Sequence, residues 1–313
     1  MDRIIGLLLF ALLVGCAQPV SQAPDVINGS SAQSARLDGA ATAAYLTTLY
    51  GRQLANCNEV DSKPAFLCSG VMFRVTDKDP NNTYKVWDPS PTSIKNGGVN
   101  FSYLRADTNF DKFAWDKTNS NGYILYPVLE RPANTDQLKV LCSYPMDSYG
   151  WHRSATAVCV AHPSYPNSGH CQDAGITTGE QFKNAWSSAP GDQNRRQCDF
   201  DVRDERNRLA GPAFYQSLRA KSLLGATGFS QWNDILVKTW AAGKPNALPI
   251  LAFYYSPAKN DPKALADAQY NQRDFYNSTN PKIVVPIIRV ALPTVLTGKA
   301  TFTYVAADQA ITQ

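Results

Sequence analysis

Three short segments of the sequence carry side chains whose types and surroundings could serve chemistry. Arg74 and Ser102 each follow a phenylalanine inside an apolar run typical of a β-strand, and Gln272 and Asp274 flank an arginine ahead of a third run. A planar guanidinium on a strand could recognise an anionic group. A carboxylate stabilises positive charge that develops at a sugar carbon. The alternative for Arg74 is structural, because an arginine on a strand can pack its stem and direct its charge to water or to a carboxylate.

A second cluster of charged residues lies at 199–206, where aspartates alternate with arginines. Asp201 or Asp204, together with Glu130, could supply the carboxylate pair of a glycan hydrolase. We favour a solvated helix face, because Asp199 lies four residues before Arg203 and charges of alternating sign usually mark such a face. The three histidines have no zinc-type spacing, so we expect no metal site.

The N-terminus has the pattern of an export signal. Residues 4–14 form an apolar run that is too short to span a membrane as a mature helix. Residues 1–15 resemble the signal peptide of a bacterial lipoprotein, with Cys16 directly after a small residue. This resemblance implies cleavage before Cys16, lipidation of its thiol and attachment to the outer membrane, because Ala17 rather than an aspartate follows. The alternative is a plain secretory signal and a secreted protein.

Six cysteines remain after Cys16, and an even number in an exported chain indicates disulfides. We expect nearest neighbours to pair, because each loop is then short enough to close locally. The expected pairs are Cys57–Cys68, Cys142–Cys159 and Cys171–Cys198. The absence of Cys-x-x-Cys argues against a redox or zinc motif.

The composition is that of an ordinary globular protein. The 313 residues are 44% hydrophobic and 18% charged, and the net charge of +4 is dispersed, which argues against nucleic-acid binding. Residues 16–35 are polar and read as a tether that follows the lipidated cysteine. We expect residues 36–313 to form a single domain that meets the membrane only through the lipid anchor.

Strand patterns dominate the first half of this domain, and helix patterns precede the last strands. Helices are expected at 37–56, 177–186, 212–224 and 232–240, the second of them opened by a capping-box pattern at Thr177 and Glu180. Strands are expected at 66–75, 84–87, 99–104, 123–129, 138–144, 249–255, 283–292 and 300–305. Pro286 indicates an edge strand or a bulge. The expected class is α+β: a disulfide-braced, mostly antiparallel sheet with a central-to-C-terminal helical section.

The order of the three polar segments resembles the layout of ADP-ribosyltransferase toxins. In that family an arginine holds a phosphate of NAD, a serine supports the pocket on the nicotinamide side, and a glutamate contacts the ribose. Longer blocks resemble the halovibrin family, which are exported bacterial NAD glycohydrolases related to ADP-ribosyltransferases. These blocks are F-L-C-S-G-V-M-F-R at 66–74, G-G-V-N-F-S-Y-L-R at 97–105, C-D-F-D-V-R-D at 198–204 and Q-R-D-F-Y-N at 272–277.

The resemblance to the toxins implies a role for each polar residue. Arg74 would hold the pyrophosphate, Ser102 would order the adjoining pocket, Asp274 would stabilise the ribosyl cation, and Gln272 would orient the substrate or acceptor. Trp87 or Tyr103 would stack on nicotinamide. NAD+ is then a substrate, no cofactor is expected, and water or a protein side chain accepts the ADP-ribose.

The rival hypothesis is a non-catalytic envelope lipoprotein that binds a glycan or a protein partner. The sequence contains 15 tyrosines and 6 tryptophans, which are residue types common at binding interfaces. A hydrophobic core would use the same side chains equally well.

Overall fold

The structure is a computed structural model that describes residues 35–36, 38–52, 69–76, 85, 89–113, 120–125, 139–148, 159, 169–188, 198–202, 210–239, 250–257 and 261–311. Several expectations lie outside these residues, namely those for the signal peptide, Cys16, residues 16–34 of the tether, the Cys57–Cys68 pair, Trp87, Glu130 and Asp204. None of the described helices combines the length and the apolar character needed to cross a membrane.

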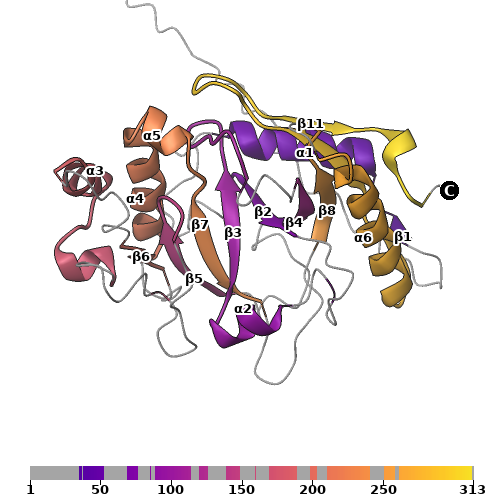
Figure 1. Ribbon diagram of the computed structural model, residues 1–313, viewed down its shortest axis with the longest axis horizontal. Coiled ribbons are helices and arrows are strands. Elements are labelled where there is room, and N and C mark those ends of the chain that lie inside the picture. Colours follow the sequence, from indigo (N-terminus) through magenta and orange to yellow (C-terminus); the bar gives the residue numbers. More distant parts are fainter. Residues whose placement is uncertain are drawn as a thin grey trace, which may run out of the picture.

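A nine-stranded sheet organises the described part of the chain, with its strands in the order β11-β10-β8-β4-β2-β3-β7-β5-β6 (Figure 1). Every neighbouring pair runs antiparallel except β8 and β10, which are parallel. The fold is therefore α+β with a mostly antiparallel sheet, as the strand patterns predicted. The strands are β2 Val71–Val75, β3 Val99–Leu104, β4 Asn121–Leu125, β5 Lys139–Tyr144, β6 Phe200–Asp201, β7 Asp234–Lys238, β8 Ile250–Tyr255, β10 Ile287–Ala291 and β11 Thr301–Tyr304.

Two shorter strands form a separate parallel pair, β1 Ala35–Arg36 with β9 Ile283–Val284. The polar segment that we expected to reach residue 35 thus joins the fold at Ala35. Pro286 lies between β9 and β10 and divides the expected strand 283–292 into two. The described helices are α1 Gly39–Gly51, α2 Pro91–Lys95, α3 Gly179–Ser187, α4 Ala210–Leu223, α5 Ala226–Phe229 and α6 Ala264–Ser278, with 3-10 turns η7 Cys171–Ala174 and η9 Ala306–Asp308.

Each face of the sheet has its own hydrophobic core. Phe73 of β2 packs with Leu46 of α1 on one side, which we call the α1 face. Met72 points the other way, into the core that α3, α4 and α6 cover, which we call the α6 face. Successive side chains of a strand alternate between faces, so the two cores interleave along β2. Figure 1 shows α4 beside β5 and β6 and α6 beside β8, with β2, β3 and β4 between the two helices.

The helix that we expected at 232–240 is wrong, because this segment forms the strand β7. Ile235 and Val237 enter the core of the α6 face, whereas Leu236 packs in the opposite direction with Cys142 and Tyr144. Three consecutive apolar side chains can be buried in this way only on a strand that is covered on both faces. Burial on both sides outweighs the helical spacing of the apolar residues in this segment.

Residues 264–278 form α6, a helix that the apolar periodicity did not predict. Its buried positions are Ala264, Ala268, Asn271, Gln272 and Phe275. The stripe that faces the sheet is therefore small or polar for most of its length, and it gives a weak amphipathic signal. The segment 272–274 accordingly lies on a helix that packs against the sheet.

The start of α3 differs from the expected capping box by one residue. The Thr178 side chain accepts a hydrogen bond from the Gln181 main-chain nitrogen, and the Gln181 side chain accepts one from the Thr178 main chain. The box is thus Thr178 with Gln181 instead of Thr177 with Glu180. Two orphan amides at the helix start are satisfied reciprocally.

Candidate functional site

A row of paired residues connects Arg74 to α6 across the α6 face. Arg74 of β2 is paired with Tyr123 of β4, and Tyr123 is paired with Phe253 of β8. Phe253 in turn meets Phe275 of α6 edge to face, with ring centroids 5.9 Å apart. Neighbouring strands are about 4.8 Å apart, so the main chain of Arg74 lies about 10 Å from that of Phe253. Arg74 and α6 therefore belong to the same side of the sheet.

The Arg74 side chain is half-buried at the end of β2. Its Nη1 donates a hydrogen bond to the main-chain oxygen of Asn100 at 2.9 Å. No carboxylate among the described residues lies within ion-pair distance of this guanidinium. A half-buried guanidinium that is held by a carbonyl retains donors for an anionic ligand.

The two flanks of α6 face different parts of the sheet. Residues of an α-helix follow one another at about 100°, so Gln272 lies about 60° to one side of Phe275, and Asn271 and Asp274 lie about 40° and 100° to the other. Gln272 bonds to Val285 and to Gln309, which places its flank over the C-terminal segments. The opposite flank, with Asn271 and Asp274, faces β4, which α6 also contacts, and β2 beyond it.

Asp274 lies on the flank that faces Arg74. Its Oδ1 accepts a hydrogen bond from Lys85 Nζ at 2.6 Å, and the two side chains are 21% and 46% exposed respectively. An ion pair with this much exposure contributes little to stability. Asp274 is thus a partly buried carboxylate, and its partner Lys85 is exposed enough to turn away from it into the solvent. The geometry places Asp274 and Arg74 on one side of the molecule.

Ser102 lies on the other face of the sheet. It is directly opposite Phe73 in the pairing of β2 with β3, so its side chain shares the α1 face with Phe73. Arg74, the next residue after Phe73, points to the α6 face. The expectation that Ser102 and Arg74 line one pocket is therefore wrong, because strand alternation separates them by the thickness of the sheet.

Tyr103 is a core residue and cannot stack on a ligand. Its side chain is 0% exposed, and its ring meets Phe214 of α4 edge to face. Its hydroxyl donates to the main-chain oxygen of Ser69, and burial raises its pKa above the ordinary value. The proposed contact of this ring with nicotinamide is thus corrected to a structural role.

Gln272 also has a structural role, because its amide fastens the C-terminal segment to α6. Its Nε2 donates to the Val285 oxygen at 2.7 Å and to Gln309 Oε1 at 3.1 Å. Its Oε1 accepts from the main-chain nitrogens of Ala310 and Ile311 at 2.7 and 3.2 Å. All of the hydrogen-bonding capacity of this amide is used inside the protein, so Gln272 cannot orient a substrate as expected.

The residue before Gln272 behaves differently, and sequence reasoning missed it. Asn271 is 1% exposed, yet neither its Oδ1 nor its Nδ2 has a hydrogen-bond partner among the described residues. The signal in the sequence is an asparagine that occupies a core-facing position four residues before Phe275. Buried polar groups without partners are rare and call for an explanation.

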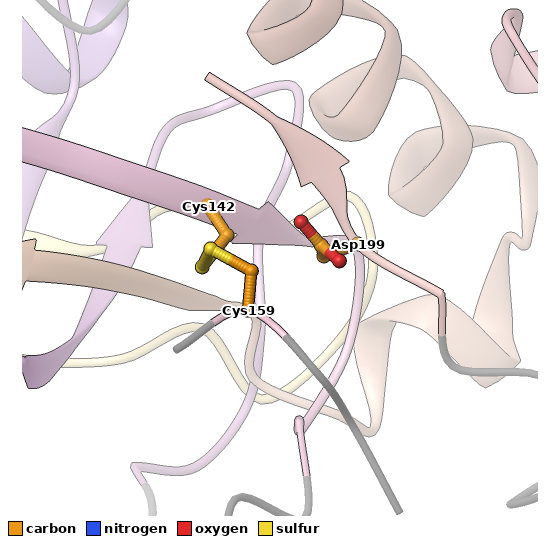
Figure 2. A group of neighbouring side chains, drawn as sticks. All are labelled: Cys142, Cys159 and Asp199. Carbon is orange, nitrogen blue, oxygen red and sulfur yellow. A yellow bond between two sulfur atoms is a disulfide. The ribbon is translucent and has the colours of Figure 1, made fainter. Parts of the chain in front are cut away.

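The two described disulfides brace the opposite end of the sheet. Cys142 bonds to Cys159 and Cys171 bonds to Cys198, which are two of the nearest-neighbour pairs that the sequence predicted. Figure 2 shows Cys142 on β5 with Cys159 beside it and Asp199 close by at the start of β6. These three residues offer donor atoms within 4.8 Å of one another, but the two sulfur atoms are bonded together and cannot act as thiolate ligands.

His170 lies between two carboxylates at this end. Its Nδ1 is 3.0 Å from Asp199 Oδ2, and its Nε2 is 3.4 Å from Asp201 Oδ2. The Cys171–Cys198 disulfide joins the residues next to His170 and Asp199 and holds this contact in place. Asp199 immediately precedes the short strand β6, Phe200–Asp201, which pairs with β5, so residues 199–201 do not form the solvated helix that we expected, and residues 203–206 lie outside the described part of the chain.

Burial raises the pKa of Asp199 to about 6, while the hydrogen bond and charge of His170 oppose this rise. A carboxyl group whose pKa is raised by folding stabilises the protein while it is protonated. Its contribution is complete below its ordinary pKa of 3.8 and is lost as the pH rises through about 6. This range corresponds to a loss of about 3 kcal/mol.

We expect Asp199→Asn to remove this pH dependence. An asparagine keeps an acceptor for His170 but does not ionise, so the variant should gain about 3 kcal/mol relative to the wild type between pH 4 and pH 7. Urea unfolding at several pH values measures this difference. Asp173→Asn, at an exposed position of the turn η7, should keep the wild-type profile. Parallel profiles for the wild type and Asp199→Asn would show that the carboxyl titrates normally.

Comparison with protein-family models matches no family to this chain, and comparison with curated proteins matches no relative.

Proposed function

We propose that this protein is an exported, lipid-anchored enzyme that hydrolyses NAD+ at the bond between nicotinamide and ribose. The observation that carries this proposal is that strand alternation directs the Arg74 side chain to the α6 face, the side of the sheet that is covered by the helix carrying Asp274. The choice of NAD+ as substrate follows the resemblance to the halovibrin family that we inferred from the sequence blocks at 66–74, 97–105, 198–204 and 272–277.

The site needs one cation and one carboxylate with different tasks. Arg74 binds the pyrophosphate through its remaining guanidinium donors and fixes the dinucleotide along β2. Asp274 stands beside the nicotinamide ribose, where its negative charge stabilises the oxocarbenium-like transition state. Ser102, Tyr103 and Gln272 take no part, because the core uses them.

The reaction balances without a further reactant. The bond between C1′ of the ribose and the pyridinium nitrogen breaks, and its electron pair leaves with nicotinamide, which becomes neutral. Water forms the new bond to C1′ and releases a proton, which gives ADP-ribose. Asp274 can accept that proton once Lys85 has moved away from it.

Substitution of the two charged residues tests this function. We expect Arg74→Lys and Asp274→Asn each to lower the rate of hydrolysis of a fluorescent NAD+ analogue by at least about 10²-fold, because a fixed electrostatic contact to the transition state is lost. Arg273→Lys changes an exposed arginine next to Asp274 and should leave the rate unchanged. Failure of the wild type to hydrolyse the analogue, or full activity of Arg74→Lys, would exclude the proposal.

A non-catalytic binding protein is the second candidate. The burial of Ser102, Tyr103 and Gln272 favours it, since three of the residues expected in an enzymatic site serve the core. The two functions separate in one measurement. A rise in melting temperature with NAD+ and no turnover indicates binding alone, whereas turnover indicates the enzyme.

A further inference from the structure

An unpaired amide is buried on the flank of α6 that faces Arg74. Asn271 is 1% exposed and both polar atoms of its side chain lack a partner in the described part of the chain, whereas the adjacent Gln272, equally buried, makes four hydrogen bonds. Removing an amide from water without replacing its hydrogen bonds destabilises a fold. None of the described residues supplies a partner for this amide, so a group from outside the chain, a water molecule or a ligand, would have to satisfy it.

The position of Asn271 indicates where that partner lies. Asn271 and Asp274 are three residues apart on one flank of α6, so their Cβ atoms are about 5–6 Å apart. Asn271 is nearer to the sheet and Asp274 nearer to the surface. A ligand that enters beside Asp274 and extends inward would meet the Asn271 amide with its buried end.

We propose that Asn271 is a ligand-binding residue that recognises a planar group with one hydrogen-bond donor and one acceptor, and that this group is the carboxamide of nicotinamide. This proposal rests on the proposed function, which places Asp274 at the ribose that carries nicotinamide. The amide of Asn271 offers the complementary acceptor and donor. Adenine has a similar edge, but it lies at the far end of the dinucleotide, beyond the pyrophosphate that Arg74 holds.

In the variant Asn271→Leu, the stability of the free protein and its affinity for NAD+ should change in opposite directions. Asn271→Leu keeps nearly the same volume and removes the unpaired amide, so we expect the melting temperature of the free protein to rise by about 2–4 °C. The same variant should bind NAD+ at least 10-fold more weakly, because two hydrogen bonds to the carboxamide are lost. Gln272→Leu is the matched control and should lower the melting temperature, because it leaves four partners without their bonds.

Substrate analogues identify which edge Asn271 reads. The 3-acetylpyridine analogue of NAD+ keeps the carbonyl but lacks the amide donor, and we expect the wild type to bind it at least 10-fold more weakly than NAD+. Asn271→Leu should bind both with equal affinity. The hypoxanthine analogue lacks the adenine amino group, and we expect both proteins to bind it as they bind NAD+. If the wild type bound the hypoxanthine analogue more weakly than NAD+, and Asn271→Leu bound the two equally, the nicotinamide assignment would be overturned.

The outcomes separate this inference from the function on which it rests. Hydrolysis by the wild type, with unchanged discrimination and a lowered melting temperature in Asn271→Leu, would overturn the role of Asn271 and leave the enzyme intact. Absence of NAD+ binding and hydrolysis in the wild type would overturn both. A raised melting temperature together with lost discrimination supports the assignment.

Discussion

Replacing Arg105 with alanine should lower the free energy of unfolding by about 3–5 kcal/mol. The Arg105 side chain is 0% exposed, and its Nε and Nη2 donate to the two carboxylate oxygens of Asp107 at 2.9 and 3.1 Å. Nη2 also donates to the Arg52 oxygen at 3.0 Å, and Nη1 donates to the Ser69 hydroxyl. The guanidinium thus joins α1, the start of β2 and the end of β3. Its loss removes these four hydrogen bonds and opens a cavity.

Urea unfolding of the variant measures this effect. Arg219→Ala is the matched control, because Arg219 also pairs with a carboxylate, that of Glu180, but both side chains are largely exposed. We expect no change in the urea midpoint for this control, since exposed ion pairs contribute little. Equal urea midpoints for Arg105→Ala and the wild type would mean that water replaces the hydrogen bonds of the guanidinium without loss of stability, and would contradict the prediction.

Strands could be predicted from the sequence where a run of apolar residues indicates that the segment is buried. The segment 99–104 is apolar at most positions and forms β3 with the expected bounds, and 138–144 forms β5 from Lys139. β7 was mistaken for a helix because Trp232, Ile235, Leu236, Thr239 and Trp240 have helical spacing. The choice between the two periods depends on which neighbours cover the segment, and that is decided by the tertiary structure.

The separation of Arg74 from Ser102 depends on strand register. Each residue lies on a strand as predicted, and either could have shared a face with the other. The pairing of Phe73 with Ser102 decides the matter, and a shift of one residue would have placed Arg74 opposite Ser102. Register depends on the turns and on packing against both cores, so it could not be predicted from a single sequence.

The helix α6 and its buried flank could not be predicted from the sequence for a different reason. Alanines and amides occupy most of the buried positions, so neither the helix nor the buried state of Asn271 is visible in the hydrophobic pattern. A polar residue at a core position is the feature in which local rules conflict with the fold. Such conflicts are expected at functional sites. The buried polar residues that weakened the helix signal are therefore also a reason to expect a site on this flank of α6.

Removal of the Cys171–Cys198 disulfide should lower the free energy of unfolding by about 3 kcal/mol. The two cysteines are 27 residues apart in the sequence, and closing a loop of this size restricts the unfolded chain by about that amount. The expected effect has a second part, because the disulfide flanks His170 and Asp199. Without it the His170–Asp199 contact loosens and the Asp199 carboxyl gains water, so its raised pKa should fall toward the ordinary value.

A double variant, Cys171→Ala with Cys198→Ala, separates the two parts. We expect it to be less stable than the wild type at every pH and to lack the loss of stability that the wild type shows between pH 4 and pH 6. The pair Cys142→Ala with Cys159→Ala, whose cysteines are 17 residues apart, should lose a similar amount of stability from loop closure. Because the sulfur atoms of this disulfide lie within 4.8 Å of an Asp199 carboxylate oxygen, we expect this variant also to admit water to Asp199 and to weaken the pH dependence. An unchanged pH profile in the first variant would show that the strand pairing of β5 with β6, and not the disulfide, keeps Asp199 buried.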